Sequence, residues 1–297
     1  MSKVLVVINP NSGDSNNENL QEPLKEKLSQ KFDDVDIIFT EKALDAVEFA
    51  KRACREKYEA ICSVGGDGTL NEIFRGLKNE THVPKLIIIP GGTGNILSKM
   101  LGIPQNPTDA IEKINFDETQ KLDIAEIADK CFSISFSIGA IPESVHDVSS
   151  EDKTKFGMFA YLINIIKNIG VGNDYKVKVT TEDEVFEGEV DHLIITLTNR
   201  FGGFKFSDVD SDLDDGYANI YILTSSNFLD KVSTASDAVF GKLEKNDNIK
   251  HLRAKKVKIE SLDHREIPTD IDGDEGPQLP VEINIIESKI EFYGTIE

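Results

Sequence analysis

The chain has 297 residues and a formal net charge of −20 at pH 7, from 53 acidic and 33 basic side chains. This acidic excess argues against nucleic-acid binding, because phosphates would be repelled, and against strong binding to an anionic membrane. The length is sufficient for two domains with substantial cores.

The sequence has no apolar run near the roughly 20 residues that span a bilayer, and it starts with a strand pattern instead of a charged leader. Its 3 cysteines show no CxxC spacing and are expected to be reduced and mostly buried. The 5 histidines show no metal-ligand spacing. These features predict a cytoplasmic protein.

Up to about residue 122, strand patterns alternate with helix patterns, which is typical of a parallel α/β layer. The expected strands lie at about 3–9, 35–39, 59–64 and 85–89, and the expected helices near 18–31, 42–56, 69–78 and 94–101.

Two of these strands run into glycine-rich turns, GGDGT at 65–69 and GGTGN at 91–95. Glycine lacks the Cβ that would keep a ligand away, so backbone N–H groups can converge on an anion at the start of the next helix. Both turns would lie at the carboxyl ends of parallel strands, where ligands bind. A tight βα turn with a polar cap is the alternative for the first. Asp67 is unusual there, because a carboxylate repels phosphate unless it holds a metal, takes a proton or anchors the turn.

After residue 122, strand patterns dominate and suggest a β-sandwich. They lie at 125–138, 175–180, 185–197, 218–223, 257–261, 281–286 and 289–294, with helices near 155–169 and 228–244. The apolar, aromatic segment 156–171 is the best candidate for a local membrane contact. An ordinary helix packed on a sheet is the alternative.

Two acidic clusters lie in this second half. SDVDSDLDDG at 207–216 could chelate a hard divalent cation, but it lacks the glycine and glutamate positions of an EF-hand loop, and a solvated acidic turn is the alternative. DIDGDEG at 270–276 is the better catalytic candidate. Phosphoryl transfer to a hydroxyl needs a carboxylate within reach of the hydroxyl proton, and Asp272 and Asp274 flank one glycine. Glu275, the residue after Asp274, is a rival candidate for the carboxylate that takes this proton.

Together these motifs resemble the diacylglycerol kinase catalytic-domain family, in its soluble bacterial lipid kinase branch. The matching motifs occur in the family's order over the whole chain: GGDGTLNE at 65–72, PGGTGN at 90–95, KLD at 121–123, LDDGY at 213–217 and DGD at 272–274. GGDGT alone is shared with NAD kinases and phosphofructokinases. The resemblance implies an α/β protein of two domains. Residues 1–122, with a returning C-terminal segment at about 287–297, would form a nucleotide-binding domain with a parallel sheet, and 123–286 a mainly antiparallel β-sandwich for lipid substrate and metal.

The resemblance further implies an ATP- and Mg²⁺-dependent kinase that transfers the γ-phosphoryl group to a lipid hydroxyl, with a diacylglycerol-like head. Asp274 would be the base, Asp272 a metal or orienting partner, and Asp67 a further catalytic residue. The implied nucleotide-binding residues are Asn9, Thr40, Gly65, Gly66, Asp67, Gly68, Thr69, Leu70, Asn71, Glu72, Gly92 and Thr93. The implied Mg²⁺ ligands are the Asp215 side chain and the carbonyls of Asp212 and Tyr217, and the supporting residues are Asn95 and Asp123.

Three positions depart from the family's pattern. Ile96 stands where the family commonly has Asp, Asp274 where it has Glu, and Ile134 where it often has Asn. A kinase for a soluble substrate such as NAD, or a non-catalytic nucleotide- or lipid-binding homologue, therefore stay as alternatives. The expected partners are a lipid substrate and, transiently, the inner face of the membrane, with no nucleic acid. Analogy alone allows a homodimer.

Overall fold

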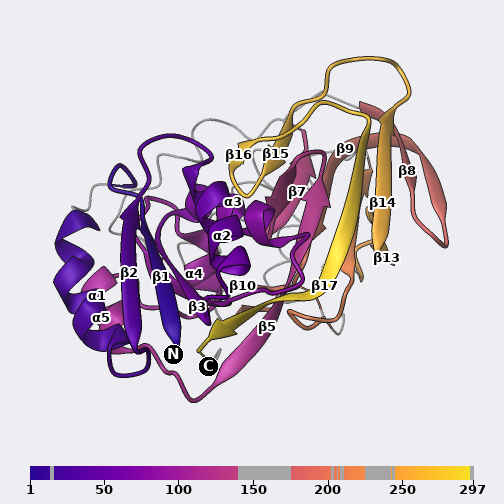
Figure 1. The fold of residues 1–297 in the computed structure, drawn as a ribbon. Coiled ribbons are helices and arrows are strands. Elements are labelled where there is room, and N and C mark those ends of the chain that lie inside the picture. The colour runs from indigo at the N-terminus through magenta and orange to yellow at the C-terminus, as the bar shows by residue number, and fades with distance from the viewer. Residues whose placement is uncertain are drawn as a thin grey trace. The chain divides into compact units, whose positions relative to one another are not determined.

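The computed structural model describes residues 1–13, 17–139, 175–201, 204–205, 207, 211–224, 242 and 245–294. The chain divides into two compact units, Met1–Ser133 with Ile286–Glu297, and Ile134–Ile285 (Figure 1). The boundary expected near residue 122 lies within the first unit. Within the described ranges, no helix has the length and apolar character needed to cross a membrane. The helices expected near 155–169 and 228–244, and the apolar segment 156–171, lie outside the described residues, apart from residue 242.

The first unit contains a parallel sheet of adjacent strands in the order β2 (Asp34–Phe39), β1 (Lys3–Ile8), β3 (Ala60–Gly65) and β4 (Lys85–Pro90). The end of β17 (Val281–Tyr293) continues it beside β4 in parallel. Two further strands complete this edge, since β5 (Thr119–Ile127) pairs with β17 and β6 (Lys130–Phe132) pairs with β5. The strands β1, β3 and β4 are almost wholly buried apolar runs, as is typical of central parallel strands.

Helices cover both faces of this sheet (Figure 1). Alternate residues of β1 and β3 share one core with the short helices α1 (Gln21–Leu28) and α5 (Pro107–Glu112). Because successive strand residues point to opposite faces, the remaining residues of these strands face the other layer. That layer holds α2 (Asp45–Arg55) and α3 (Asp67–Leu77), which pack on each other and on β1 and β3. The segments η1 (Asn17–Leu20) and α4 (Ile96–Met100) lie beside the loops after β1 and β4.

The second unit is antiparallel. Its strands run as neighbours in the order β16 (Asp274–Glu275), β15 (Thr269–Ile271), β7 (Ser135–Ile138), β9 (Val185–Thr196), β12 (Ala218–Thr224) and β13 (Ile249–Ala254). The first half of β9 also pairs with β8 (Tyr175–Thr180), which pairs with β14 (Lys256–Ser261), which in turn pairs with the start of β17. The pair β10 (Arg200–Phe201) and β11 (Phe204–Lys205) stands apart. Parallel strands in the first unit and antiparallel strands in the second confirm the expected fold class.

Two expected strand patterns are divided differently in the structure. The run 125–138 is not one strand, because the chain turns at Ala128, with φ of 51°, between β5 and β6, and is interrupted again before β7. Conversely, the two runs at 281–286 and 289–294 form the single strand β17, in which Ser288 has a φ of 49°.

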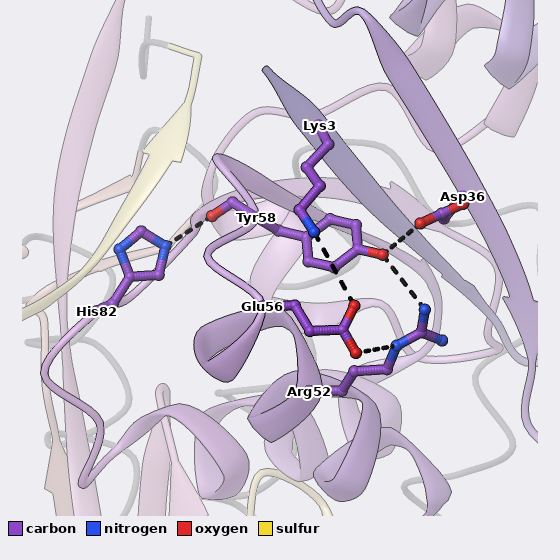
Figure 2. A network of polar contacts seen from close by, with 6 residues as sticks. All are labelled: Lys3, Asp36, Arg52, Glu56, Tyr58 and His82. Atoms are coloured by element: carbon purple, nitrogen blue, oxygen red, sulfur yellow. Dashed lines mark hydrogen bonds and ion pairs between the residues drawn. The ribbon is translucent and has the colours of Figure 1, made fainter. Parts of the chain in front are cut away.

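A polar network surrounds Tyr58 (Figure 2). It lies near the amino ends of the parallel strands, since Lys3 starts β1 and Tyr58 precedes β3, and the glycine turns follow the other ends of β3 and β4. The Tyr58 side chain is 1% exposed, and its hydroxyl donates to Asp36 and accepts from Arg52 at 3.4 Å. The Lys3 ammonium lies 4.1 Å from the centre of the ring, and a ring nitrogen of His82 lies 2.7 Å from the Tyr58 carbonyl oxygen. Burial and the hydrogen bond to Asp36 raise the pKa of Tyr58, so the hydroxyl stays a donor.

The variant Tyr58→Phe should lower the free energy of unfolding by ~1–2 kcal/mol, because the ring is kept while Asp36 and Arg52 lose their partner. Urea unfolding measures this loss. Tyr293→Phe is the matched control, since its ring packs edge-on against Phe32 and Phe116 and its hydroxyl has no hydrogen bond to any described residue. An equal fall in the free energy of unfolding of both variants would show that the hydrogen bonds of the Tyr58 hydroxyl add nothing to stability.

Candidate active site

Three loops meet at the carboxyl ends of β1, β3 and β4, where the strand order reverses between β1 and β3. Their backbones touch. A Cβ on Gly13, which has a φ of +65°, would lie 2.9 Å from the carbonyl oxygen of Gly91, and a Cβ on Gly92 would lie 2.5 Å from the Cα of Gly66. Real Cβ atoms do not approach so closely, so glycine is required at these positions for the loops to pack, whether or not a ligand is bound.

Asn17 ties the first of these loops to the third, and the sequence patterns did not single it out. Its side chain is fully buried, and Nδ2 lies 2.9 Å from the carbonyl oxygen of Asn9, 3.2 Å from that of Ser12 and 3.2 Å from that of Gly91. The available signal was its place directly before an expected helix, where Asn is a common cap.

Asp67 anchors the second glycine turn to the third loop. Its Oδ2 accepts the N–H of Ile96 at 2.9 Å and its Oδ1 accepts the N–H of Leu97 at 3.1 Å, at the start of α4. Burial raises the pKa of the Asp67 carboxyl, and these two N–H groups and Lys99 act in the opposite direction. Of the three roles open to this carboxylate, the structure therefore provides contacts for the anchoring one.

The loop GGTGN at 91–95 is closed by its own last residue. Asn95 is 7% exposed and left-handed, with a φ of 49°. Its Oδ1 accepts the N–H of Gly92 at 2.9 Å and its Nδ2 donates to the carbonyl oxygen of Gly92 at 2.8 Å. Asn95 thus gives the loop its shape.

Several residues expected to bind nucleotide make contacts within the surrounding scaffold. Asn9 donates to the hydroxyl of Thr69 at 3.1 Å, and Leu70 is 3% exposed, in the core. Thr40 is buried and its N–H bonds to the carbonyl oxygen at the end of β1. The Glu72 carboxylate accepts two backbone N–H groups, from residue 44 at 2.9 Å and residue 46 at 3.2 Å, and so fixes the start of α2.

A few groups at these loops remain available to a ligand. Gly68, Thr93 and Gly94 are exposed, and their backbone N–H groups have no acceptor in the described part of the chain. The side-chain Oδ1 of Asn71 is buried without a donor among the same residues. Exposed amides at the start of a helix suit an anion, and a buried carbonyl oxygen suits a ligand hydroxyl.

The acidic loop of the second unit is held by Asp272. This residue is 5% exposed with a φ of 52°, and its Oδ1 accepts the N–H of Ile134 at 3.1 Å and of Ser135 at 2.8 Å. Asp274 and Glu275 are exposed on β16. In the strand register Asp274 pairs with position 271 and Glu275 with position 270, so the two carboxylates start from opposite faces of the hairpin.

The turn expected to bind Mg²⁺ is organised around Asp215. Its Oδ2 accepts the N–H of Asp212 and its Oδ1 that of Tyr217, both at 2.9 Å, and the Arg253 guanidinium lies 2.6 Å from Oδ2. The Arg253 guanidinium also lies 4.6 Å from the centre of the Tyr217 ring. A cation would therefore compete with Arg253 for this carboxylate. The described residues contain no group of three or more Asp, Glu, His or Cys that could hold a metal.

Asp123 supports the returning C-terminal strand. It is fully buried in β5, and its Oδ1 accepts the N–H of Ser288 in β17 at 2.6 Å. Asp123 thus stabilises β17 within the first unit.

The raised pKa of Asp67 predicts a pH-dependent stability. The native state binds this proton more tightly than the unfolded state, so the contribution is complete below the unfolded pKa of 3.8 and is lost as the pH rises through the folded pKa. Asp67→Asn lacks this contribution. The free energy of unfolding of the wild type relative to this variant should therefore fall as the pH is raised from about 4 to 7, measured by urea unfolding.

Asp45→Asn is the matched control. Asp45 also accepts two backbone N–H groups, from Glu41 at 2.8 Å and Lys42 at 3.0 Å, but it is solvated, and these bonds lower its pKa. The wild type should gain stability relative to this variant over the part of the same range where Asp45 titrates. Slopes of the same sign for both variants would contradict the assigned contacts.

The chain matches known families over most of its length. Residues 3–127 match the diacylglycerol kinase catalytic domain, and residues 138–293 match the YegS C-terminal NAD kinase beta sandwich-like domain. A Streptococcus pneumoniae protein named "Putative lipid kinase" is 41% identical over 99% of this chain and 98% of the relative. A Staphylococcus carnosus protein named diacylglycerol kinase is 31% identical over 97% of this chain and 94% of the relative.

A solved structure agrees with the fold. The crystal structure of a diacylglycerol kinase from Bacillus anthracis is similar with a TM-score of 0.79 and 27% identity, covering 99% of this chain and 97% of that one. The resemblance drawn from the motifs is confirmed. The chain belongs to the diacylglycerol kinase catalytic-domain family and is a lipid kinase.

Proposed function

We propose that the protein uses ATP and Mg²⁺ to phosphorylate a hydroxyl of a diacylglycerol-like lipid. The observation that carries this proposal is the packing of three glycine loops, which leaves the N–H groups of Gly68, Thr93 and Gly94 exposed at the carboxyl ends of β3 and β4. The relatives named diacylglycerol kinase support the choice of lipid.

The nucleotide would bind through these loops. The exposed N–H groups suit the triphosphate, and the buried Oδ1 of Asn71 suits a ribose hydroxyl. Mg²⁺ would arrive with the nucleotide, because the phosphate oxygens and water supply most of the ligands that this ion prefers. Asp67 would keep the two glycine loops in register for the phosphates.

In the transfer step, a carboxylate of the acidic loop takes the proton of the lipid hydroxyl. The hydroxyl oxygen forms a bond to the γ-phosphorus while the bond from that phosphorus to the β–γ bridging oxygen breaks, and ADP leaves. Asp272 would orient the loop through its bonds to β7. The motif position favours Asp274 as the base. Glu275 stays its rival, because it is the next residue on β16 and pairs with Asp270 of the same loop.

The lipid acceptor would be reached at the inner face of the membrane. The chain carries a formal net charge of −20, so this contact would be brief and local, with the acyl chains as its main attraction.

The test is transfer of label from γ-labelled ATP, with Mg²⁺, to diacylglycerol in mixed micelles. The wild type should label the lipid, and Asp274→Asn should reduce turnover by several hundredfold, because general-base contributions are about 10²–10⁴-fold. Glu275→Gln, a matched exchange at the adjacent residue, should stay within a few-fold of wild type.

The reverse ranking of these two variants would make Glu275 the base and leave the kinase proposal standing. Wild-type rates in both would remove the acidic loop from the mechanism. Labelling of a soluble acceptor in place of any lipid would overturn the assigned acceptor.

A further inference from the structure

In the second unit, one face of the sheet formed by β7, β9, β12 and β13 is apolar and the other is mostly polar. Along β7, β9, β12 and β13, directly paired residues share a face. The apolar row contains Phe136, Ile195, Ile220 and Leu252, which are at most 6% exposed. Two rows form the opposite face, which we call the polar face: Ser135, Thr196, Asn219 and Arg253, and Ser137, Ile194, Tyr221 and His251.

Three residues of the polar face are buried although they are polar. Asn219 is 0% exposed, Tyr221 4% and Ser137 8%. At the β12–β13 end its polar groups pair with one another or with neighbours. The amide of Asn219 donates to the Ser211 hydroxyl at 3.1 Å, and its oxygen lies 3.1 Å from a ring nitrogen of His251. The side chain of Asn219 is therefore satisfied by the protein itself.

The β7–β9 end is different. The hydroxyl oxygens of Ser137 and Thr196 are buried and have no hydrogen-bond partner among the residues that the structure describes. Ser137 pairs with Ile194, two positions from Thr196, so the two hydroxyls are diagonal neighbours on the same face, with Cα atoms about 7–8 Å apart. Buried polar groups in proteins nearly always have partners, so two adjacent exceptions call for a ligand.

These hydroxyls are next to the acidic loop. The Asp272 carboxylate bonds to the backbone of Ser135, which is two residues from Ser137 and directly opposite Thr196. Asp270, in the same loop, pairs in register with Ser137. Asp270 pairs in turn with Glu275, so a group that bonds to the two hydroxyls would lie on the sheet face of Glu275, the rival base. Asp274 pairs with Ile271 in the row of Phe136 and starts from the opposite face.

We propose that Ser137 and Thr196 bind the uncharged polar head of the acceptor lipid through its hydroxyl and ester oxygens, an inference that rests on the proposed function. A hydroxyl can both donate and accept, which suits an alcohol or ester. The nearby carboxylates of Asp270, Asp272 and Glu275 disfavour a phosphate-bearing head. The two residues thus select a neutral glycerolipid.

The kinetic test uses Ser137→Ala, Thr196→Val and the double variant, with 1,2-dioctanoylglycerol as acceptor. Each single change should raise the KM for the lipid about fivefold to tenfold and leave the KM for ATP unchanged, because one hydrogen bond to the acceptor is lost. Thr224→Val is the matched control. Its hydroxyl, on β12, already donates to the carbonyl oxygen of Asn248 at 3.2 Å, so the KM for the lipid should not change.

A second readout does not depend on activity. Without lipid, the two single variants should keep or raise the Tm, because each removes a buried hydroxyl that has no partner among the described ranges. Thr224→Val should lower the Tm. Addition of dioctanoylglycerol should raise the Tm of the wild type, and this rise should be largely lost in the double variant.

The outcomes separate the two proposals. Lipid phosphorylation with an unchanged KM and an unchanged lipid-induced rise in Tm in the double variant would overturn this inference and leave the kinase function standing. A lipid-induced rise that requires both hydroxyls, without phosphoryl transfer by the wild type, would support the site and overturn the proposed function. No transfer and no rise in the wild type would overturn both.

Discussion

The candidate nucleotide site depends on the absence of side chains where three loops touch. Gly13, Gly66 and Gly92 bring the backbones after β1, β3 and β4 within van der Waals contact, and a Cβ at Gly92 would be only 2.5 Å from its neighbour. A side chain there would separate the loops and move the exposed amides of Gly68 and Thr93 apart. The glycines are therefore needed for the architecture of the site before any phosphate is considered.

Carboxylates that hold backbone N–H groups recur through the chain. Asp67 holds the start of α4, Glu72 the start of α2, and Asp272 the start of β7, each through two N–H groups. Asp215 and Asp45 do the same for their turns. Because N–H groups at a helix start or a turn have no partner in regular structure, an ionised acceptor is well suited to them. Acidic residues in the motifs thus position loops, besides any role in the chemistry.

The sequence was sufficient for what depends on local pattern. Strand periodicity and glycine turns placed both phosphate-suited loops at the carboxyl ends of β3 and β4. Helix α5 was not predicted, although Asn106 and Pro107 form a standard helix start, in which the Asn106 side chain accepts two N–H groups. The three contacts of Asn17 could not be predicted, since one of them joins residues 74 positions apart. The hydroxyls of Ser137 and Thr196, which have no hydrogen-bond partner in the described part of the chain, are brought together by strand register, which a single sequence does not determine.

The strand β17 makes the first unit discontinuous in sequence. Its start pairs with β14 in the second unit, and its end lies beside β4 in the first. Until β17 has been synthesised, the parallel sheet therefore has β4 unpaired on one side, and Asp123 lacks the N–H of Ser288 as a partner. Unpaired strand edges favour wrong association between chains. The sheet of the first unit is thus completed only after the second unit has been made, although most of the first unit precedes the second in the chain.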